Sequence, residues 1–195
     1  MKKRIISLLI CLAVAATTLL GMAWADLLPT GLFVRYAAVT GQQETVSYVV
    51  GAGQTQVRSN QCTILEASDT DIQLDAGWYA VKAGNLTVDG DIKTTGDVHI
   101  VLCDYANLVV NGSFLTQGGG SVSIYAQTFD QVGKTGCMTV DSTRASAFER
   151  QSGDPDPAKL CIYGGKIQAK GSQRAMDKNY LVHVGDGTEK ACQTT

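Results

Sequence analysis

The chain has 195 residues, with 16 Lys and Arg against 18 Asp and Glu and a formal net charge of −2 at pH 7. Apolar residues make up 45% of it, which is enough to bury the core of about one domain. This charge balance argues against nucleic acid or an anionic membrane surface as the main partner.

Residues 1–25 have the features of a secretory signal peptide. Basic residues at positions 2–4 precede an apolar stretch over residues 5–20, and Ala23 and Ala25 are small residues where a signal peptidase cuts. Cleavage before Asp26 takes three from the 16 basic residues, which leaves 13 against 18 acidic ones and a net charge of −5. We therefore expect a secreted or cell-surface protein with no membrane span in the mature chain; an uncleaved anchor is the alternative.

Residues 26–70 are predicted to form a β-rich lead-in. Apolar and polar residues alternate in VRYAAVT, TVSYVV and CTILEAS, and Gly41, Gly51 and Gly53 interrupt the pattern. Such alternation is typical of half-buried strands. After Asp26 no segment keeps a helical period for long; residues 142–151 come closest, and we expect them to be a surface loop or a single helical turn.

From Asp71 to the end of the chain, residues 71–195, the sequence repeats. Residues 86–102 (LTVDGDIKTTGDVHIVL) match residues 108–126 (LVVNGSFLTQGGGSVSIYA), with an offset of 22 in the first half and 24 in the second. Each copy contains three short strand patterns separated by an Asp-Gly or Asn-Gly corner and a glycine corner. A looser copy follows at residues 160–171, with further strands expected at residues 136–142 and 181–185.

A fixed period with insertions only at a corner predicts a β-solenoid. One coil cannot bury its own apolar side chains, so coils stack about 4.8 Å apart and equivalent residues form inward columns. We expect about four to five coils; a β-sandwich is the competing architecture. The predicted columns pair Leu86 with Leu108, Ile92 with Phe114, Val98 with Val122 and Ile100 with Ile124.

The order of these motifs resembles a repeat segment of large exported and surface proteins of gut Firmicutes. The matching stretches lie within residues 62–171 and are residues 77–81 (GWYAV), 96–102 (GDVHIVL), 122–127 (VSIYAQ) and 160–171 (LCIYGGKIQAKG). The resemblance implies a right-handed parallel β-helix with a pectin-lyase-like shape, in proteins of mostly unassigned function. One departure is that Tyr105 replaces the glycine of the D-G-A corner.

Aromatic residues are the best binding candidates in the sequence. Trp78, Tyr125 and Tyr163 fall on or near successive predicted coils, where rings on an outer face can stack on sugars. We predict that these three residues contact glycans or components of a host or cell-wall surface. The alternatives are that Trp78 caps the open end of the core and that the tyrosines pack as ordinary half-buried residues.

Paired carboxylates could indicate a polysaccharide lyase or glycoside hydrolase on the same fold. The pairs are Asp69/Asp71, Asp89/Asp91 and Asp154/Asp156, and Asp141 with Arg144 forms a further candidate. Each carboxylate pair lies at a turn signal, where Asp commonly accepts backbone N–H bonds, so turn chemistry is the stronger interpretation. Asp141 and Arg144 are interpreted as a surface loop pair.

Histidines and cysteines give no metal or nucleophile motif. His99 and His183 are predicted on the outer face of strands, and no cysteine spacing forms a metal knuckle or a C-x-x-C motif. The cysteines are interpreted as small buried residues, with one disulfide as the alternative: Cys62, Cys103, Cys137, Cys161 and Cys192. We therefore predict a non-catalytic surface protein for adhesion or carbohydrate contact, without a metal or cofactor; a lyase or hydrolase and a purely structural spacer are the alternatives.

Overall fold

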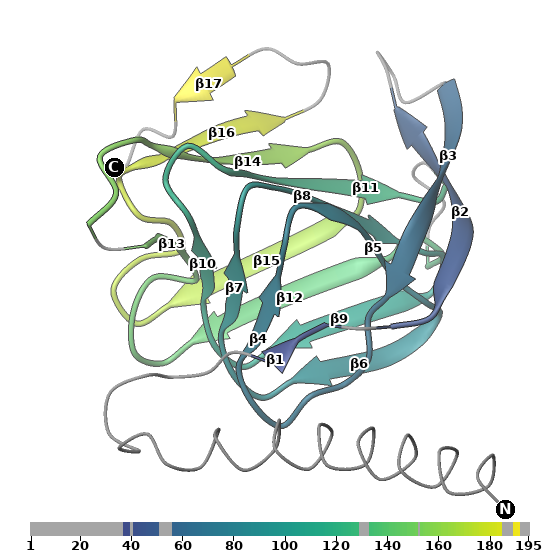
Figure 1. Cartoon of the computed structure of the whole chain (residues 1–195), viewed down its shortest axis with the longest axis horizontal. Coiled ribbons are helices and arrows are strands. Elements are labelled where there is room, and N and C mark those ends of the chain that lie inside the picture. The colour runs from purple at the N-terminus through teal and green to yellow at the C-terminus, as the bar shows by residue number, and fades with distance from the viewer. Residues whose placement is uncertain are drawn as a thin grey trace, which may run out of the picture. The chain divides into compact units, whose positions relative to one another are not determined.

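The structure is a computed structural model that describes residues 37–39, 41–50, 56–128, 133–151, 153–184 and 189–191. The predicted signal peptide and residues 26–36 of the lead-in lie outside the described residues. Within them the chain is all-β, as predicted, and its strands form three sheets (Figure 1). No helix with the length and apolar character needed to cross a lipid bilayer occurs in this described part.

The first sheet consists of short strands that pair in parallel. In three of its three-residue strands the outer two residues are buried and the middle one is partly exposed, because side chains alternate between the two faces; in the fourth, Phe148–Arg150, only Phe148 is buried. Its strands, in spatial order, are β1 (Ala37–Ala38), β4 (Ile72–Leu74), β7 (Ile92–Thr94), β10 (Phe114–Thr116) and β13 (Phe148–Arg150).

The second sheet is the largest, and it is parallel except at its two ends. There β2 pairs antiparallel with β3, and β16 pairs antiparallel with β17. Its strands, in spatial order, are β17 (Glu189–Ala191), β16 (Tyr180–Val184), β14 (Ala158–Ile162), β11 (Ser121–Ala126), β8 (Asp97–Leu102), β5 (Gly77–Val81), β3 (Gln56–Ile64) and β2 (Gln43–Val50).

The third sheet is parallel throughout. Its terminal strand β15 carries Lys166 and Lys170 as exposed residues. Its strands, in spatial order, are β15 (Lys166–Gly171), β12 (Cys137–Ser142), β9 (Ala106–Val110) and β6 (Gly84–Val88).

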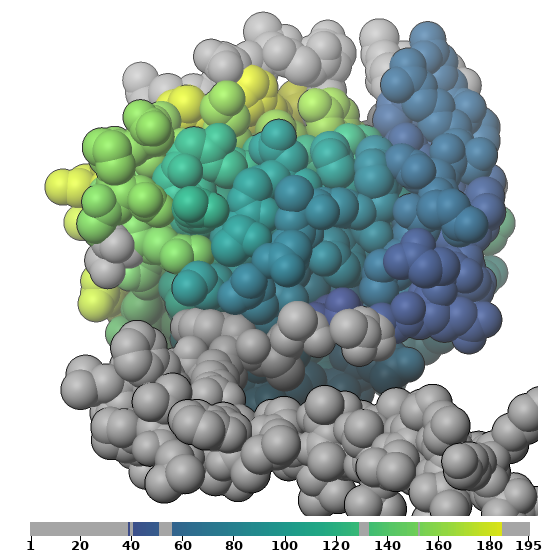
Figure 2. All heavy atoms as spheres, viewed as in Figure 1, coloured from purple at the N-terminus to yellow at the C-terminus, as the bar shows by residue number. Residues whose placement is uncertain are grey.

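The chain visits the three sheets in rotation. Strands β4, β5 and β6 are followed by β7, β8 and β9, then by β10, β11 and β12, and then by β13, β14 and β15. Each strand from β4 to β12 pairs with the strand three places later, so each round of the chain adds one strand to each of the three sheets. In Figure 2 the colour of the visible face changes gradually from the blue β2–β3 hairpin at the right to green at the left, as this order requires.

The register predicted from the repeat is confirmed. Ile92 pairs with Phe114 at an offset of 22, and Val98 pairs with Val122 at an offset of 24, because extra glycines lengthen the corner between them. The predicted pairs Leu86 with Leu108 and Ile100 with Ile124 are also observed.

Inward residues of all three sheets form one apolar core. Most of its members are fully buried, and each aliphatic or aromatic side chain contributes about 1.5–3 kcal/mol by leaving water. Phe114 and Phe148 stack within it, with ring centroids 5.4 Å apart. The largest fully buried side chains are Tyr180, Phe114, Phe148, Leu74, Ile92, Ile100, Leu102, Leu108, Ile124, Met138, Leu160 and Val81.

One sequence-based expectation is wrong. Residues 142–151, predicted as a surface loop or a single helical turn, contain β13, which pairs with β10 so that Phe148 lies beside Phe114 and Arg150 beside Thr116. The strand was missed because a longer segment between β11 and β12 moves β13 away from the position that the 22-residue repeat predicts. Phe148 therefore follows Phe114 by 34 residues instead of 22.

The predicted lead-in belongs to the same sheets. Ala37 of β1 pairs with Ile72 in the first sheet, and Thr63 of β3 pairs with Tyr79 in the second. The β2–β3 hairpin forms eight antiparallel pairs, so this part of the chain is β-rich as expected. Strand β1 extends the first sheet beyond β4, and β3 and β2 extend the second sheet beyond β5.

The corner between β8 and β9 departs from the glycine pattern. Tyr105 is 62% exposed and has a φ of 61°, and it is the non-glycine residue with positive φ among the described residues. Its backbone N–H donates to Lys134 O at 2.7 Å and its carbonyl accepts from Gly84 at 3.0 Å. Neighbouring chain segments therefore hold this uncommon conformation in place.

Candidate functional site

Five rings gather on the outer face of the second sheet, and we call them the aromatic row. Trp78, His99 and Tyr125 come from β5, β8 and β11, where their strand neighbours face the core. Tyr163 follows β14 directly, and Tyr48 is contributed by β2. The row therefore combines residues from four consecutive strands of the sheet with one residue of the hairpin.

The rings contact one another in sequence. Trp78 stacks on His99 with ring centroids 4.3 Å apart and an interplanar angle of 12°. Tyr125 stacks on Tyr163 at 5.0 Å and 10°, and Trp78 lies 5.3 Å from Tyr125. Each such pair contributes about 0.5–1.5 kcal/mol beyond the burial of area. The structure thus brings the predicted residues Trp78, Tyr125 and Tyr163 together.

Tyr48 attaches the hairpin to the row. Its ring centroid lies 4.8 Å from that of Trp78 and 4.9 Å from that of Tyr125, and the residue is 6% exposed. The adjacent Val46 of the same strand is also buried. The alternation in TVSYVV is the sequence signal that could have identified Tyr48 as a packing residue.

The three predicted residues differ in accessibility. Tyr125 is only 8% exposed, because Trp78 and Tyr163 stack against it and Tyr48 packs nearby. Trp78 and Tyr163 remain partly exposed, as does His99. Trp78 does not cap the end of the core, since its neighbour Tyr79 faces inward and Trp78 faces outward. Only Trp78 and Tyr163 offer ring area to a ligand among the three.

Burial sets the charge state of the row. It raises the pKa of Tyr125 to about 12, with the Tyr163 phenol adding to the shift. It lowers the pKa of His99, against the opposing effect of Asp97. The Tyr125 hydroxyl lies 3.4 Å from His99 Nδ1. At neutral pH the rings of the row, three phenols, an indole and an imidazole, are therefore uncharged.

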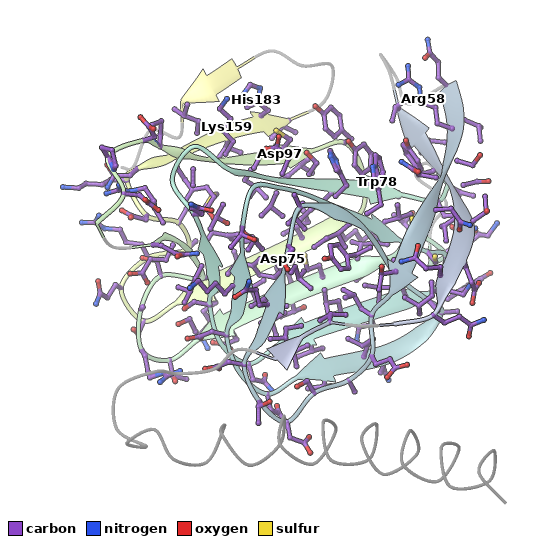
Figure 3. The ribbon with its side chains drawn as sticks, viewed as in Figure 1. Arg58, Asp75, Trp78, Asp97, Lys159 and His183 are labelled. Atoms are coloured by element: carbon purple, nitrogen blue, oxygen red, sulfur yellow. The ribbon has the colours of Figure 1, made fainter. Side chains whose placement is uncertain are left out.

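Polar side chains flank the row on the same face. Asp97, Ser121 and Lys159 occupy equivalent positions on β8, β11 and β14, and Ser121 Oγ donates to Asp97 Oδ1 at 2.7 Å. Figure 3 shows Trp78, Asp97, Lys159 and His183 in the spatial order of their strands β5, β8, β14 and β16, with Lys159 closer to His183 than to Trp78. Hydrogen-bonding groups thus follow the rings strand by strand, about 4.8 Å apart.

His99 and His183 both face outward, as predicted, but they are not neighbours. Ser123 and Cys161 lie between them in the same register column, so three strand spacings of about 4.8 Å separate them. That separation is too large for both imidazoles to bind one metal ion. In the described part of the chain, no group of three or more His, Cys, Asp or Glu residues is placed to hold a metal.

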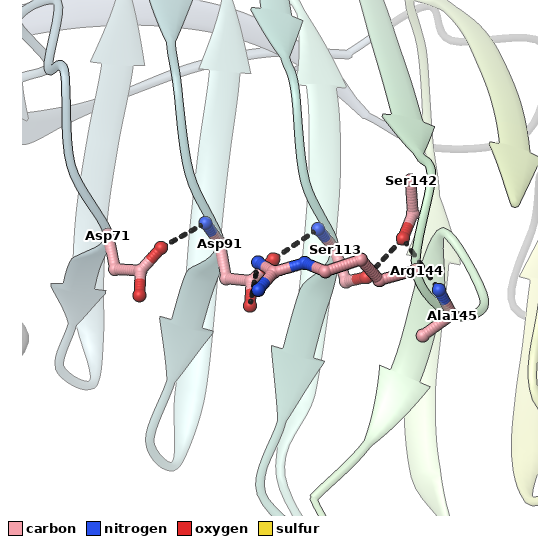
Figure 4. A network of polar contacts seen from close by, with 6 residues as sticks. All are labelled: Asp71, Asp91, Ser113, Ser142, Arg144 and Ala145. Atoms are coloured by element: carbon pink, nitrogen blue, oxygen red, sulfur yellow. Dashed lines mark hydrogen bonds and ion pairs between the residues drawn. The ribbon is translucent and has the colours of Figure 1, made fainter. Parts of the chain in front are cut away.

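Two of the predicted carboxylate pairs take part in a corner network that crosses successive strands (Figure 4). Asp71 Oδ1 accepts from the Asp91 backbone N–H at 2.7 Å, and Asp91 Oδ1 accepts from Ser113 at 2.8 Å. Ser113 Oγ then donates to Ser142 Oγ at 2.8 Å. These two carboxylates have the backbone role that the turn interpretation predicts.

Two further acidic candidates are also engaged. Asp89 accepts from the Asn111 side chain, and Asp154 Oδ2 accepts from the Gly118 N–H at 2.7 Å. The predicted pair of Asp141 and Arg144 is wrong, because Asp141 pairs with Lys170 at 3.1 Å and Arg144 pairs with Asp91 at 3.5 Å. The third sheet aligns Asp141 with Lys170, whereas the corner places Arg144 over Asp91.

The cysteines within the described residues are unpaired. Cys62 and Cys103 are buried, and Cys137 and Cys161 are partly exposed. Burial raises the pKa of Cys62 to about 11 and also raises that of Cys161, so both are uncharged thiols at neutral pH. Cys192 lies outside the described residues. Cys62 and Cys103 are small buried residues, as predicted, whereas the expectation of burial is wrong for Cys137 and Cys161.

A shallow hollow of about 440 Å³ lies on the third sheet, away from the row. Thr139 and Asp141 of β12 and Gln168 and Lys170 of β15 line it. The ion pair between Asp141 and Lys170 crosses this hollow and uses its two charged groups.

Comparison with known proteins adds no further assignment. No protein-family model matches the chain, and no curated protein or solved structure matches it. The family resemblance of residues 62–171 therefore stays a prediction. The case for a function depends on the residues of the second sheet themselves.

Proposed function

We propose that the three sheets are the faces of a right-handed parallel β-helix. The support is the parallel pairing of each strand from β4 to β12 with the strand three places later, which gives four rounds from β4 to β15, and the parallel pairing of β16 with β14. In such a fold each side chain contacts its equivalents on the neighbouring coils. The result is a rigid rod with long, regular outer faces.

We further propose that this protein is secreted or displayed at the cell surface and binds carbohydrate through the outer face of the second sheet. The observation that carries the proposal is the aromatic row: Trp78 and Tyr163 keep partly exposed rings, and Asp97 and Lys159 flank them. A non-catalytic role in adhesion or glycan contact follows from this arrangement.

The contact would combine stacking and hydrogen bonds. A sugar ring laid against Trp78 or Tyr163 buries its apolar C–H face, while its hydroxyls reach the flanking polar groups. Tyr125 supports the two outer rings from between and is itself buried. The strand spacing is comparable to the length of one sugar unit, so an extended glycan could meet one strand with each unit.

The charge of the face suits a neutral glycan. Burial lowers the pKa of His99, so the imidazole is uncharged at neutral pH, and Asp97 and Lys159 balance one another. A strongly anionic polymer would be repelled by the net charge of −5 expected for the mature chain.

The test is a glycan array followed by titration calorimetry with any sugar that binds. Trp78→Ala and Tyr163→Ala should each weaken binding by up to about tenfold, as expected for the loss of a stacking contact of about 0.5–1.5 kcal/mol. Tyr105→Ala is the matched control, because Tyr105 is exposed but lies at the corner between β8 and β9, outside the row. It should bind like the wild type.

Other results would point elsewhere. Equal affinities of wild type and both variants would remove the proposal. Release of reducing ends or unsaturated uronates from pectin or mucin, with or without Ca²⁺, would instead favour a hydrolase or lyase. Neither binding nor turnover would favour a structural spacer.

A further inference from the structure

The inward column of the first sheet changes from apolar to polar along the stack. Leu74, Thr94, Thr116 and Arg150 pair in this order on β4, β7, β10 and β13. The first three are fully buried. Arg150 shares their face because it pairs with Thr116 and lies two residues after the buried Phe148. A guanidinium therefore follows two threonines inside the first sheet.

The threonines below Arg150 have hydrogen-bond partners. Thr94 Oγ1 donates to Thr116 Oγ1 at 3.1 Å, and the hydroxyl of the buried Tyr180 donates to the same Thr116 oxygen. Thr116 Oγ1 thus accepts two hydrogen bonds and still has its own proton to donate. This part of the column is polar but satisfied.

Two of the three guanidinium nitrogens of Arg150 have no such partner, although the residue as a whole is partly exposed. Arg150 Nε and Nη1 are both shielded from solvent, and neither forms a hydrogen bond within the described part of the chain. Glu149 points to the opposite face of β13, and Asp177 Oδ1 accepts from the Asn179 N–H. Arg144, by contrast, is exposed and pairs with Asp91. Shielded N–H donors without an acceptor are unfavourable, and here they belong to a cation, so an anionic acceptor is expected beside them.

We propose that Arg150 binds a small oxyanion from solution at the β13 end of the first sheet. A guanidinium presents several N–H donors in one plane, which match the oxygens of a sulfate, phosphate or carboxylate group. The Thr116 hydroxyl, one strand away, supplies a further donor in the same column. This site is on a different sheet from the aromatic row and does not depend on the carbohydrate proposal.

The experiment measures thermal unfolding of the wild-type protein in sodium sulfate, phosphate, acetate and glucuronate, against sodium chloride at the same ionic strength. A bound anion raises the Tm in a saturable way, because it binds the folded state. The inorganic and carboxylate arms distinguish the two classes of oxyanion. Titration calorimetry with the most effective anion then gives the stoichiometry, expected to be one per chain.

Arg150→Met removes the charge and keeps the length of the side chain, and Arg144→Met is the matched control. Sulfate and phosphate also stabilise proteins by exclusion from the surface, and this general effect should be equal in both variants. We expect the saturable part to vanish in Arg150→Met and to persist in Arg144→Met. Arg150→Lys, which keeps the charge but loses the planar fork, should weaken binding by about tenfold or more.

A wild-type Tm that responds to all anions as it does to chloride would overturn the proposal, even if no variant folds. The same conclusion would follow if Arg150→Met retained the saturable response. A measured stoichiometry of one that disappears in Arg150→Met and remains in Arg144→Met would support it.

Discussion

The outer face of the second sheet and the inward face of the first sheet reverse the usual distribution of side chains. The outer face carries a row of rings, including Trp78 and Tyr125, whereas the inward face carries the hydroxyls of Thr94 and Thr116. In both, neighbouring strands of one column supply partners: Trp78 stacks on His99, and Thr94 bonds to Thr116. Whether a ring or a hydroxyl is tolerated at a position therefore depends on its contacts with the neighbouring strands as well as on the side of the sheet that it occupies.

The largest loss of stability is expected when the central ring of the row, that of Tyr125, is removed. Tyr125→Ala deletes a buried side chain that contacts Tyr48, Trp78 and Tyr163, and we expect a loss of about 3–5 kcal/mol in the free energy of unfolding. Urea unfolding measures it. Tyr125→Phe keeps the ring and should change little. A loss below 1 kcal/mol in the Ala variant would show that the row does not hold the hairpin.

A smaller loss is expected inside the first sheet. Thr116→Val keeps the shape but leaves the buried hydroxyls of Thr94 and Tyr180 without their partner, which should cost about 1–3 kcal/mol. Thr116→Ser retains the hydroxyl and serves as the control. In a double-mutant cycle, Tyr180→Phe should recover part of the loss, since it removes one of the orphaned groups. Purely additive losses would contradict the proposed column.

The smallest effect concerns pH. Burial lowers the pKa of His99 in the folded state below its ordinary value of 6.5. The unfolded chain then binds the proton more tightly than the folded one. The neutral ring therefore makes its full contribution to the free energy of unfolding at pH values above 6.5. It is lost as the pH falls from there through the folded-state pKa. Unfolding between pH 8 and pH 5 should show this decline, and His99→Gln should reduce it.

The matched control for this pH series is His183→Gln, which changes the other histidine on the same face. A decline of the same size in wild type and His99→Gln would assign the pH dependence to other groups. The comparison separates a ring held within the aromatic row from one outside it.

The sequence allowed the register to be predicted because the repeat is local and short. Ile92 and Phe114, or Val98 and Val122, could be aligned by eye, since only a corner separates the matching patterns. Phe148 could not, because the insertion before β12 hides its equivalence to Phe114. With β13 missed, the inward position of Arg150 was missed as well.

The binding residues were only partly predictable. Alternation placed Trp78 and Tyr125 on one face, but it could not show that their neighbours shield Tyr125. That shielding depends on Tyr48, which comes from a hairpin 77 positions earlier in the chain than Tyr125. The contacts of the carboxylates were clearer, because an Asp at a corner has backbone donors close by.

Strand β15 closes the third sheet with Lys166 and Lys170. A stack of parallel strands can in principle lengthen by adding a strand from another molecule, which is the first step toward a fibre. An approaching copy of the same strand would set lysine against lysine, and this repulsion discourages such growth. Strands of one chain can thus pair regularly with one another, while the lysines of β15 disfavour the same pairing between two chains.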